Sequence, residues 1–374
     1  ATASATAAPT VTSQPQATVT SPPPTEIIPP ADEIRLPTGF GISLFVSGLN
    51  DPRMMTVGPD GALYVAERGA GRIVRLPDAD ENGIADGVEI AAEGLSAPSS
   101  LDFHPDGSLY VGETTRILRL RDPDGDGRFQ EREVVIDGLP SGGHNTRTVR
   151  LSPEGEHLFV SIGSSCNVCI EDDERRATIM RYAPDGSDEM IYADGLRNAV
   201  GITFRPGADQ LWATNNGRDW LGDNQPPETI YHVQQGEDAG WPRCHAARLV
   251  DPEFGEPGAC EGVAEPEVEM QAHSAPLGLT FYTGEQFPAD YHGDMFVAFH
   301  GSWNRSTPTG YKVIHIPMDD QGTPGTVRDF AVGWLREDGS DWGRPVDVVT
   351  GAEGSLFISD DAGGKIYRVF YAGE

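Results

Sequence analysis

Basic side chains are scarce in this sequence, which has 27 lysines and arginines against 58 aspartates and glutamates, for a formal net charge of −31. Nucleic acids and anionic membrane surfaces are polyanions, so this balance excludes nucleic acid as a partner. Long apolar runs are missing as well. No stretch approaches the length of about 18 residues that a membrane-spanning helix needs, and we expect no membrane span. The excess of carboxylates favours Ca²⁺, because bound cations relieve their mutual repulsion.

Large apolar and charged residues are nearly absent from the start of the chain, which consists mostly of Ala, Thr, Ser, Pro, Val and Gln through Pro30. Such a segment cannot bury enough apolar surface to fold. We therefore expect a flexible stalk over residues 1–33 and a folded domain over residues 34–374. The start at Ala1 suits a processed chain, and a stalk of this kind, with or without a lipid anchor, would hold the domain off a surface. These features predict an extracytoplasmic protein that is periplasmic, secreted or surface-anchored.

Cysteine is rare, with residues only at Cys166, Cys169, Cys244 and Cys260. The spacing Cys166-Asn-Val-Cys169 could belong to a redox pair, but such a pair needs a helix that starts after a strand, and no βαβ unit is visible. A zinc site is an alternative, although the second pair lacks the close spacing of metal ligands. We favour two local disulfides, Cys166–Cys169 and Cys244–Cys260, which fit an extracytoplasmic location.

Helix signals are also nearly absent, and from Phe40 onward the chain repeats one pattern of short strands and tight turns. The turns include Gly58-Pro-Asp-Gly61, His104-Pro-Asp-Gly107 and Ser152-Pro-Glu-Gly155. Proline presets one turn angle and glycine supplies positive φ, so these residues separate neighbouring strands. Six copies with a period in the forties predict an all-β fold, a six-bladed β-propeller from about Ile34 to Tyr371.

Polar residues recur where the first strand of each repeat is expected to begin. In a propeller these positions face one end of the central channel, so together they would line a pocket. Alternatively, they only hydrate the rim of the channel. Several cations gathered in an acidic chain favour a bound anion. The residues are Arg53, Ser99, Ser100, His144, Arg147, Arg197, Asn198, His273 and Arg344.

The histidine of this set lies in the stretch Ser141-Gly-Gly-His-Asn-Thr-Arg-Thr-Val-Arg150. Histidine titrates near neutral pH, and a histidine at the mouth of a strand on a rigid scaffold suits a general base. Taken alone, His144 is better explained as a surface histidine that is hydrogen-bonded in a loop. The recurrence of polar residues at the same place in the other repeats favours the catalytic interpretation.

Two acidic turns match the twelve-residue calcium-loop pattern, with oxygen ligands at alternating positions, a glycine at the turn and a closing glutamate. Strands flank them, so we expect structural clips between blades and not a sensor. The alternative is two solvated turns. The predicted ligands are Asp78, Asp80, Asn82 and Glu89 in the first turn, and Asp122, Asp124, Asp126 and Glu133 in the second. A looser acidic stretch, from Asn215 to Glu228, either holds a metal or is a polar surface loop.

With these repeats, the motifs around three mouth residues resemble those of the soluble quinoprotein sugar dehydrogenases, and the resemblance extends over nearly everything after Phe40. It is closest to the L-sorbosone dehydrogenase-like branch. The motifs are fairly specific together and weak one by one. The family motifs are His144, Gly195-Leu-Arg-Asn198 and Arg344-Pro-Val-Asp347. Those of the sorbosone branch are Ile162-Gly-Ser-Ser-Cys-Asn-Val-Cys169, Gly240-Trp-Pro-Arg-Cys244 and His300-Gly-Ser-Trp-Asn-Arg305.

The resemblance implies pyrroloquinoline quinone (PQQ), a tricarboxylate, bound beside Ca²⁺ at the mouth of the propeller. It implies that His144 takes the proton of a sugar hydroxyl while hydride passes to the quinone. Arg197 and Asn198 would contact the quinone oxygens, and Arg344 would pair with a cofactor carboxylate, a task suited to its planar fork. By the same resemblance, Arg305 fills a basic position in the fifth blade, and the segment with Gly217 and Arg218 offers carbonyl oxygens to the calcium.

The sequence departs from the family pattern at three positions. Val346 stands where a second arginine is expected, which would weaken cofactor binding. Ser164 stands where an acidic residue orients the histidine, and we expect the histidine tautomer to be less fixed for that reason. Arg218 replaces a proline of the glucose dehydrogenases.

Three functions remain in view. The first is a PQQ-dependent dehydrogenase that oxidises an aldose or related, sorbosone-like sugar and passes electrons to an acceptor that the sequence does not name. The second is a calcium-dependent, lactonase-type hydrolase, which the cationic mouth disfavours. The third is a non-catalytic binding propeller stiffened by calcium. Fold alone does not choose among them, because propellers host many functions.

Overall fold

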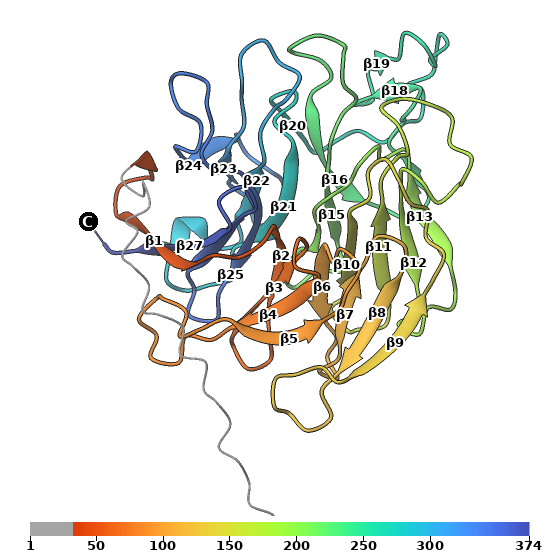
Figure 1. Cartoon of the computed structure of the whole chain (residues 1–374). Helices are drawn as coiled ribbons and strands as arrows, with labels where there is room; N and C mark the ends of the chain where they lie inside the picture. Colours follow the sequence, from red (N-terminus) through yellow and green to blue (C-terminus); the bar gives the residue numbers. More distant parts are fainter. Residues whose placement is uncertain (1–32, 374) are drawn as a thin grey trace, which may run out of the picture.

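The structure, a computed structural model, describes residues 33–373, and nearly all of their regular structure is β-strand. Figure 1 shows the sheets fanned around a common centre. Six sheets form the blades of a propeller, and a separate two-stranded hairpin lies in an insertion within the fourth blade. Strands that follow one another along the chain are mostly antiparallel neighbours within a blade.

The first three blades follow the chain order, and the third has an extra short edge strand that pairs in parallel. Blade one consists of β2 (Pro52–Val57), β3 (Leu63–Glu67), β4 (Arg72–Leu76) and β5 (Glu89–Glu93). Blade two consists of β6 (Ser100–Phe103), β7 (Leu109–Gly112), β8 (Ile117–Arg121) and β9 (Glu131–Ile136). Blade three consists of β10 (Arg147–Leu151), β11 (Leu158–Ile162), β12 (Thr178–Tyr182), β13 (Met190–Asp194) and β17 (Glu237–Asp238).

The last three blades include one long insertion and one strand from the other end of the chain. Blade four consists of β14 (Ile202–Phe204), β15 (Leu211–Asn215), β16 (Glu228–Val233) and β20 (Val268–Met270), and the insertion before β20 carries the hairpin of β18 (Cys244–His245) and β19 (Leu249–Val250). Blade five consists of β21 (Pro276–Phe281), β22 (Met295–Phe299), β23 (Lys312–Ile316) and β24 (Arg328–Val332), with the short 3-10 helix η2 (Ala289–Tyr291) before β22. Blade six consists of β25 (Pro345–Thr350), β26 (Leu356–Asp360), β27 (Lys365–Tyr371) and β1 (Phe40–Ser47).

The propeller closes on itself through its two ends. Strand β1 is the outer strand of the last blade, where Phe40 pairs with Tyr371 and Ser47 with Lys365. At the centre, β2, β6, β10, β14, β21 and β25 contact one another in that order, and β25 contacts β2 again. A closed ring of this kind leaves no inner sheet edge to be paired by another chain.

Burial explains why the sequences of the strands are short apolar runs. The second strands of all six blades, β3, β7, β11, β15, β22 and β26, are buried along their whole length because a neighbouring blade covers each face. The outer strand β9 is mostly exposed and is correspondingly polar. Between strands, Gly61, Gly107 and Gly155 adopt φ of 79°, 85° and 73°, the left-handed angles that the turn sequences predict.

The predicted all-β, six-bladed propeller is confirmed, and so are both predicted disulfides, Cys166–Cys169 and Cys244–Cys260. The predicted stalk lies outside the described residues except for Glu33, and the boundary at residue 34 stays a prediction. In the described part of the chain, no helix has the length and apolarity needed to cross a membrane.

Candidate functional site

The polar residues predicted at the channel mouth do lie at one end of the propeller. The innermost strands all run the same way, so their first residues share that end. Arg53 belongs to the start of β2, Arg147 begins β10, and Arg344 immediately precedes β25. Not all of these side chains are available to a ligand. Arg147 is buried and donates to the carbonyl oxygens of His144 (3.1 Å) and Thr146 (2.8 Å), so it supports the loop that carries the histidine.

A cavity of about 100 Å³ brings several of the predicted residues together. His144, Arg197, Asn198 and Gly217 line it, whereas Arg218, Arg305 and Arg344 do not. The other lining residues come from blades four and five and the loops beside them. They are Asn216, Asp219, Glu228, Ala275, Trp303, Asn304 and His273, of which His273 was also predicted at the mouth.

Hydrogen bonds fix the imidazole of His144. Its Nδ1 lies 2.9 Å from the Ser164 hydroxyl and 3.1 Å from the Ser164 carbonyl oxygen. The same hydroxyl donates its one proton to the Cys166 carbonyl oxygen at 2.6 Å, so it can only accept from the ring. Nδ1 therefore carries the proton, and Nε2 keeps its lone pair. Ser164 thus holds the tautomer, contrary to the expectation that its presence would leave the ring less fixed.

The surroundings also keep His144 neutral. Burial, together with the positive charge of Arg197, lowers the pKa of His144 to about 4. At neutral pH the ring is therefore an acceptor at Nε2. This is the protonation state that a general base needs before it acts.

Arg197 is buried and held from several sides. Its guanidinium donates to the carbonyl oxygen (2.9 Å) and the side-chain oxygen (3.0 Å) of Asn167, and pairs with Asp219 at 3.0 Å. It also donates to the Asn216 carbonyl oxygen at 3.3 Å. These bonds fix the orientation of the cation, since a planar guanidinium with four directed contacts cannot rotate freely.

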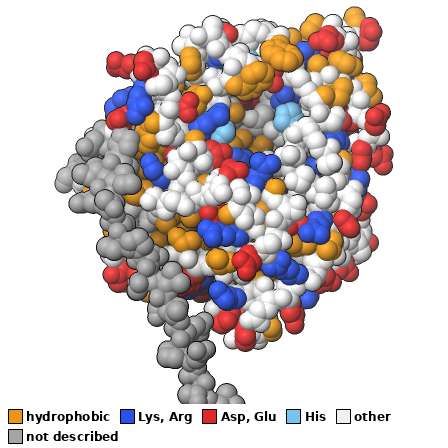
Figure 2. All heavy atoms as spheres, viewed as in Figure 1, with side chains coloured by type: hydrophobic (Ala, Val, Ile, Leu, Met, Phe, Trp, Pro, Cys, Tyr) orange, Lys and Arg blue, Asp and Glu red, His pale blue; other side chains and the backbone are white. Residues whose placement is uncertain are grey.

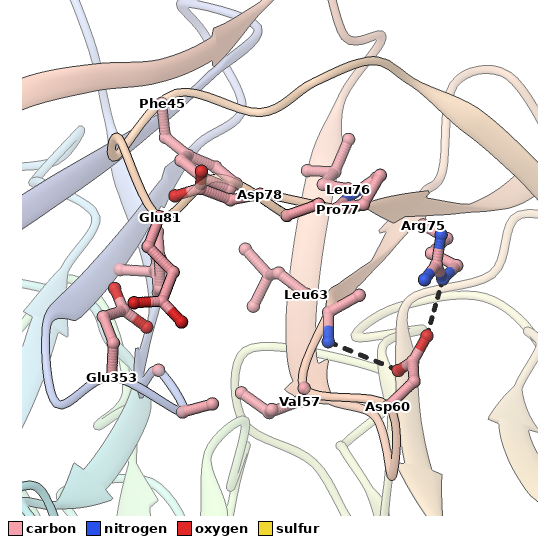
Figure 3. A pocket seen from close by; sticks show the side chains of 16 residues that line it. Phe45, Val57, Asp60, Leu63, Arg75, Leu76, Pro77, Asp78, Glu81 and Glu353 are labelled. Carbon is pink, nitrogen blue, oxygen red and sulfur yellow. Dashed lines mark hydrogen bonds and ion pairs between the residues drawn. The ribbon is translucent and has the colours of Figure 1, made fainter.

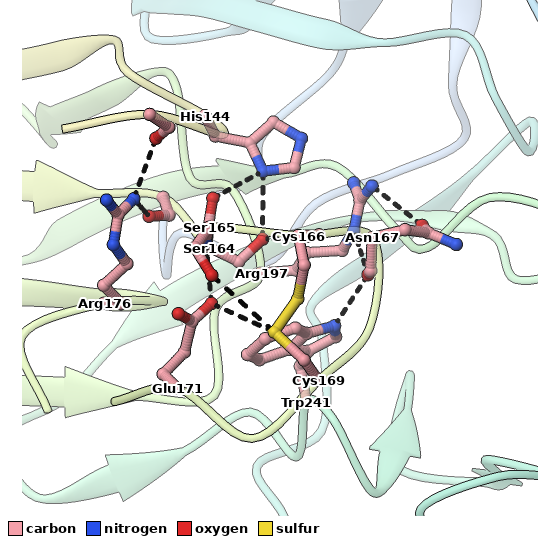
Figure 4. The surroundings of a disulfide bond; sticks show 12 residues. His144, Ser164, Ser165, Cys166, Asn167, Cys169, Glu171, Arg176, Arg197 and Trp241 are labelled. Atoms are coloured by element: carbon pink, nitrogen blue, oxygen red, sulfur yellow. Dashed lines mark hydrogen bonds between the residues drawn. A yellow bond between two sulfur atoms is a disulfide. The ribbon is translucent and has the colours of Figure 1, made fainter. Parts of the chain in front are cut away.

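The disulfide-bridged loop Cys166–Cys169 supports both side chains (Figure 4). The Cys166 carbonyl oxygen receives the Ser164 hydroxyl that orients the histidine, and Asn167 holds Arg197. Asn167 also receives the Asp219 amide at 2.7 Å and the Trp241 indole N–H at 3.2 Å. From the sequence, this loop was predicted as a disulfide and as part of the motif Ile162–Cys169, but Asn167 was given no role. The available signal was a polar residue enclosed between two cysteines inside a family motif.

Two carboxylates face the same cavity. Asp219 accepts from Arg197 and, at 2.9 Å, from the Asn304 amide. Glu228 is buried, accepts the Gly217 amide at 2.7 Å, and has its pKa raised to about 7 by that burial. A buried carboxyl that ionises only near neutral pH, close to a second carboxylate, is a donor set that fits a divalent cation. Both residues lie in the loose acidic stretch noted in the sequence, where no spacing rule singled them out.

Arg344 lies at the mouth but faces different neighbours. Its guanidinium donates to the carbonyl oxygens of His300 and Gly301, each at 3.0 Å, and lies 5.4 Å from the ring centre of Tyr311. Within residues 33–373 it forms no ion pair. Val346, where a second arginine was expected, is fully buried in a core cluster and cannot reach a ligand.

A second ionic group accompanies Arg344. Asp361 pairs with Arg53 at 2.7 Å and with His300 at 2.9 Å, and burial lowers the pKa of His300. The positive charges of Arg53, from blade one, and of Arg344 therefore both act on His300. These cationic groups are the part of the mouth that fits an anionic ligand.

Arg305 and Arg218 have structural contacts. Arg305 donates to the carbonyl oxygens of Asp223 (2.6 Å) and Ala272 (3.2 Å), so its side chain braces a neighbouring loop. Arg218 is buried against Asp251 and Glu253, and only its backbone is left for a cation.

A protein family described as a domain of unknown function, DUF7133, matches residues 30–366. The chain belongs to this family. Among curated proteins, an uncharacterized protein of Borreliella burgdorferi is 38% identical over 231 residues, 61% of this chain and 61% of that protein. A pyrroloquinoline quinone-dependent pyranose dehydrogenase of Coprinopsis cinerea is 24% identical over 406 residues, 91% of this chain and 55% of that protein. The DUF7133 chain therefore spans only 55–61% of the length of these relatives.

Solved structures share the propeller of this DUF7133 protein. The holo form of the PQQ domain of the Coprinopsis cinerea pyranose dehydrogenase has a TM-score of 0.79 at 22% identity, covering 90% of this chain and 97% of that one. A PQQ-bound aldose sugar dehydrogenase of Streptomyces coelicolor has a TM-score of 0.66 at 19% identity, covering 90% and 99%. These matches show the fold. With the curated relative, they confirm the resemblance to the soluble quinoprotein sugar dehydrogenases that the motifs indicated.

The two predicted calcium turns of the DUF7133 protein lie at the opposite end of the propeller, between the third and fourth strands of blades one and two. In the first, next to the hollow of Figure 3, Asp78 accepts the amides of Asn82 (3.0 Å) and Gly83 (2.9 Å). Its closing residue, Glu89, pairs with Arg75 at 2.6 Å.

In the second turn the predicted ligands lie close together: Asp122, Asp124 and Asp126 place one oxygen each within 4.8 Å of one another. The closing residue Glu133 pairs with Arg121 at 3.2 Å. Calcium in either turn stays a prediction, and each glutamate would have to leave its arginine to complete the set.

Proposed function

We propose that this chain is a PQQ-dependent oxidoreductase that oxidises an aldose or related, sorbosone-like sugar, with His144 as the base. The observation that carries the proposal is a neutral histidine with a free Nε2 in one cavity with a fixed guanidinium, Arg197, and two carboxylates. PQQ is named in the curated relative from Coprinopsis cinerea and in two of the similar structures, which adds support for this cofactor.

His144 would act on the sugar hydroxyl. Its Nε2 accepts the hydroxyl proton, while Nδ1–H stays bonded to Ser164 and keeps the ring in place. PQQ, when bound, would supply a two-electron acceptor for the hydride of the carbon that bears this hydroxyl. The hydroxyl carbon therefore loses one hydride and its oxygen one proton, and a carbonyl product results. Arg197 stabilises negative charge that develops on oxygen, since its orientation is set before the reaction begins.

The cofactor site would be shared between two groups of residues. Arg344 would pair with a cofactor carboxylate through its planar fork, and Asn198 would donate to a quinone oxygen. Asp219, Glu228 and the backbone of Gly217 and Arg218 would hold Ca²⁺. The raised pKa of Glu228 supports this assignment, because a divalent cation would favour its ionised form.

Titration of the calcium-loaded protein with PQQ, followed by absorbance and tryptophan fluorescence, tests the proposal. We expect saturable binding near one cofactor per chain, lost in Arg197→Ala and retained in Arg181→Ala, a change in β12 at an arginine that contacts Gln235. Dye reduction should then depend on sugar, PQQ and calcium together. Absence of binding at tens of micromolar PQQ would contradict the dehydrogenase and leave the non-catalytic binding propeller.

A calcium-dependent, lactonase-type hydrolase is the second candidate. Its support is specific: Asp219, Glu228 and Asn216 place side-chain oxygens around one cavity. It predicts lactone hydrolysis with calcium and without quinone. The cationic side chains at the mouth, Arg53, Arg197 and Arg344, disfavour it, because a calcium held by side chains needs several oxygen ligands around one ion.

The location of the protein belongs to the same proposal. Two disulfides support an extracytoplasmic protein, periplasmic, secreted or surface-anchored, because such bonds persist in oxidising compartments. Release of the active protein from intact cells by mild extraction would test the location.

A further inference from the structure

Two tryptophans at the edge of the cavity are unusually exposed. Trp220 is 70% exposed and Trp303 is 67% exposed, and their ring centres lie 6.0 Å apart at an angle of 80°. By contrast, Trp212, Trp241 and Trp334 are buried. Exposed indoles contribute little to folding, and contiguous apolar surface at a pocket usually marks a contact with something else.

The backbone of Trp220 adds a second observation. Its φ of 68° lies in the left-handed region, which bulky side chains rarely adopt. Strain of this kind persists only where the surroundings impose it, and it concentrates at binding and catalytic sites. Folding stability does not explain a side chain that is both strained and exposed.

The loops that carry the two indoles are tied together. The Asn304 amide donates to Asp219 at 2.9 Å, next to each tryptophan in the sequence. Further along, the Ser306 amide donates to Asp223 at 3.1 Å, and the Arg305 guanidinium donates to the Asp223 carbonyl oxygen at 2.6 Å. These bonds hold the rings at the mouth, where Figure 2 shows hydrophobic, histidine and basic side chains around a hollow.

We propose that Trp220 and Trp303 form an outer sugar subsite that stacks a second ring of an oligosaccharide, while the first ring enters the cavity beside His144. The inference rests on the proposed sugar oxidation and narrows its substrate to chains longer than a monosaccharide. Trp303 lines the cavity itself, and Trp220 lies on the adjoining loop, so the two rings lead outward from the reacting position.

Sugar chemistry fits this surface better than a protein partner does. A pyranose ring presents C–H groups on its faces, which pack on the electron-rich face of an indole, and hydroxyls at its edge. Asp219, Asp223 and Asn304 place hydrogen-bonding groups on the same loops. A protein interface of useful affinity would need a much larger apolar area than two rings supply.

Calorimetry on the calcium form without quinone tests the subsite independently of catalysis. The probes are cellotriose, maltotriose and xylotriose, with glucose as the short comparison. We expect at least one trisaccharide to bind about ten-fold more tightly than glucose, and Trp220→Ala and Trp303→Ala to abolish that difference. Trp220→Phe keeps an aromatic face and should retain most of the affinity. Ile84→Ala, an exposed apolar residue at the opposite end of the propeller, is the matched control.

The outcomes separate this proposal from the proposed function. Equal affinity for glucose and all three trisaccharides, or unchanged trisaccharide affinity in both alanine variants, overturns the subsite. Loss of PQQ affinity in Trp303→Ala with unchanged trisaccharide affinity also overturns it, since the indole would then contact the cofactor. Failure of the wild type to bind PQQ counts against the dehydrogenase alone, because sugar binding is measured without it.

Discussion

The two cationic groups of the channel mouth have opposite surroundings. Arg197 pairs with Asp219, lies near Glu228 and is bound by Asn167. The Arg344 guanidinium donates to two carbonyl oxygens, and among the residues described here this guanidinium has no acidic partner. One arginine is therefore neutralised and fixed by the protein, whereas the other keeps its charge for a ligand.

This difference shows why a count of arginines at the mouth predicts little about binding. The side with Arg197 carries more carboxylate than guanidinium charge and suits a cation. On the other side, Asp361 pairs with Arg53, while the Arg344 guanidinium forms no ion pair among the described residues, so this side suits an anion. A cofactor that carries carboxylates and binds beside calcium would match both sides at once, which is the arrangement that the proposed function requires.

The largest effect should come from His144, the proposed base, which lies on the Arg197 side of the mouth. His144→Ala should lower kcat by about 10²–10⁴-fold, because the variant loses the neutral Nε2 that takes the hydroxyl proton, while PQQ affinity changes little. Stopped-flow reduction of bound PQQ by sugar measures this. A loss smaller than five-fold would remove His144 from the mechanism and transfer the role to another residue.

The same histidine predicts a pH dependence. Its pKa of about 4 in the folded protein lies below the ordinary value of 6.5, so the unfolded chain takes up this proton first. The stability that this group contributes is therefore complete above pH 6.5 and is lost as the pH falls toward 4. The wild-type rate should stay level above pH 5 and fall below about pH 4, unless another group titrates. A rate that halves near pH 6.5 would mean that the ring is not kept neutral by burial.

The second largest effect should come from Arg344, whose guanidinium keeps its charge for a ligand. Arg344→Ala should weaken PQQ binding by about 10- to 100-fold, because the variant loses a charge-assisted hydrogen bond to the cofactor. The kcat at saturating cofactor should be nearly unchanged, because this bond contributes to binding and not to the reaction step. Arg344→Lys should recover part of this affinity, and Arg336→Ala, an exposed arginine paired with Glu33, serves as the control. Equal losses in kcat and affinity would place Arg344 beside the reacting atoms.

The carboxylate side should respond to calcium. Glu228→Gln keeps the shape but removes the charge, so the calcium concentration needed for half-maximal PQQ binding should rise about ten-fold. Glu265→Gln, at an exposed position, should leave it unchanged. An unaltered calcium requirement in Glu228→Gln would mean that Glu228 does not bind the cation and that other oxygens of the mouth do.

The smallest effect should come from the bridged loop beside Arg197. Replacing Cys166 and Cys169 with serine should lower kcat about three- to ten-fold, because Ser164 and Asn167 would be less well held. The Cys244–Cys260 bridge closes 16 residues against 3, so its removal should lower the thermal midpoint more. Paired measurements of kcat and melting temperature compare the two double variants. The reverse pattern would show that the short bridge serves stability and not the site.

Sequence patterns were sufficient for the propeller, for its disulfides and for His144 and Arg197 at the mouth. The propeller follows from local rules: glycine-containing turns, apolar strands and a repeat that closes as a ring. The disulfides follow from the spacing of the cysteines and the expected compartment, and the two mouth residues from their recurring place in the repeats. The same rules failed for Asn167 and Glu228, whose roles depend on contacts with residues 30 and 11 positions away. They also failed for Arg305, where a basic residue at the expected position turns toward a loop.

What the amino-acid order decides on its own is therefore the architecture and the set of polar residues at one end of the channel. What only the folded chain decides is which of these charges stays free. Ser164 fixes the histidine, Asp219 neutralises Arg197, and Val346 is lost in the core. The reason is physical: hydrogen bonding and burial set the charge state of a side chain, and both depend on neighbours that the loops bring from other blades.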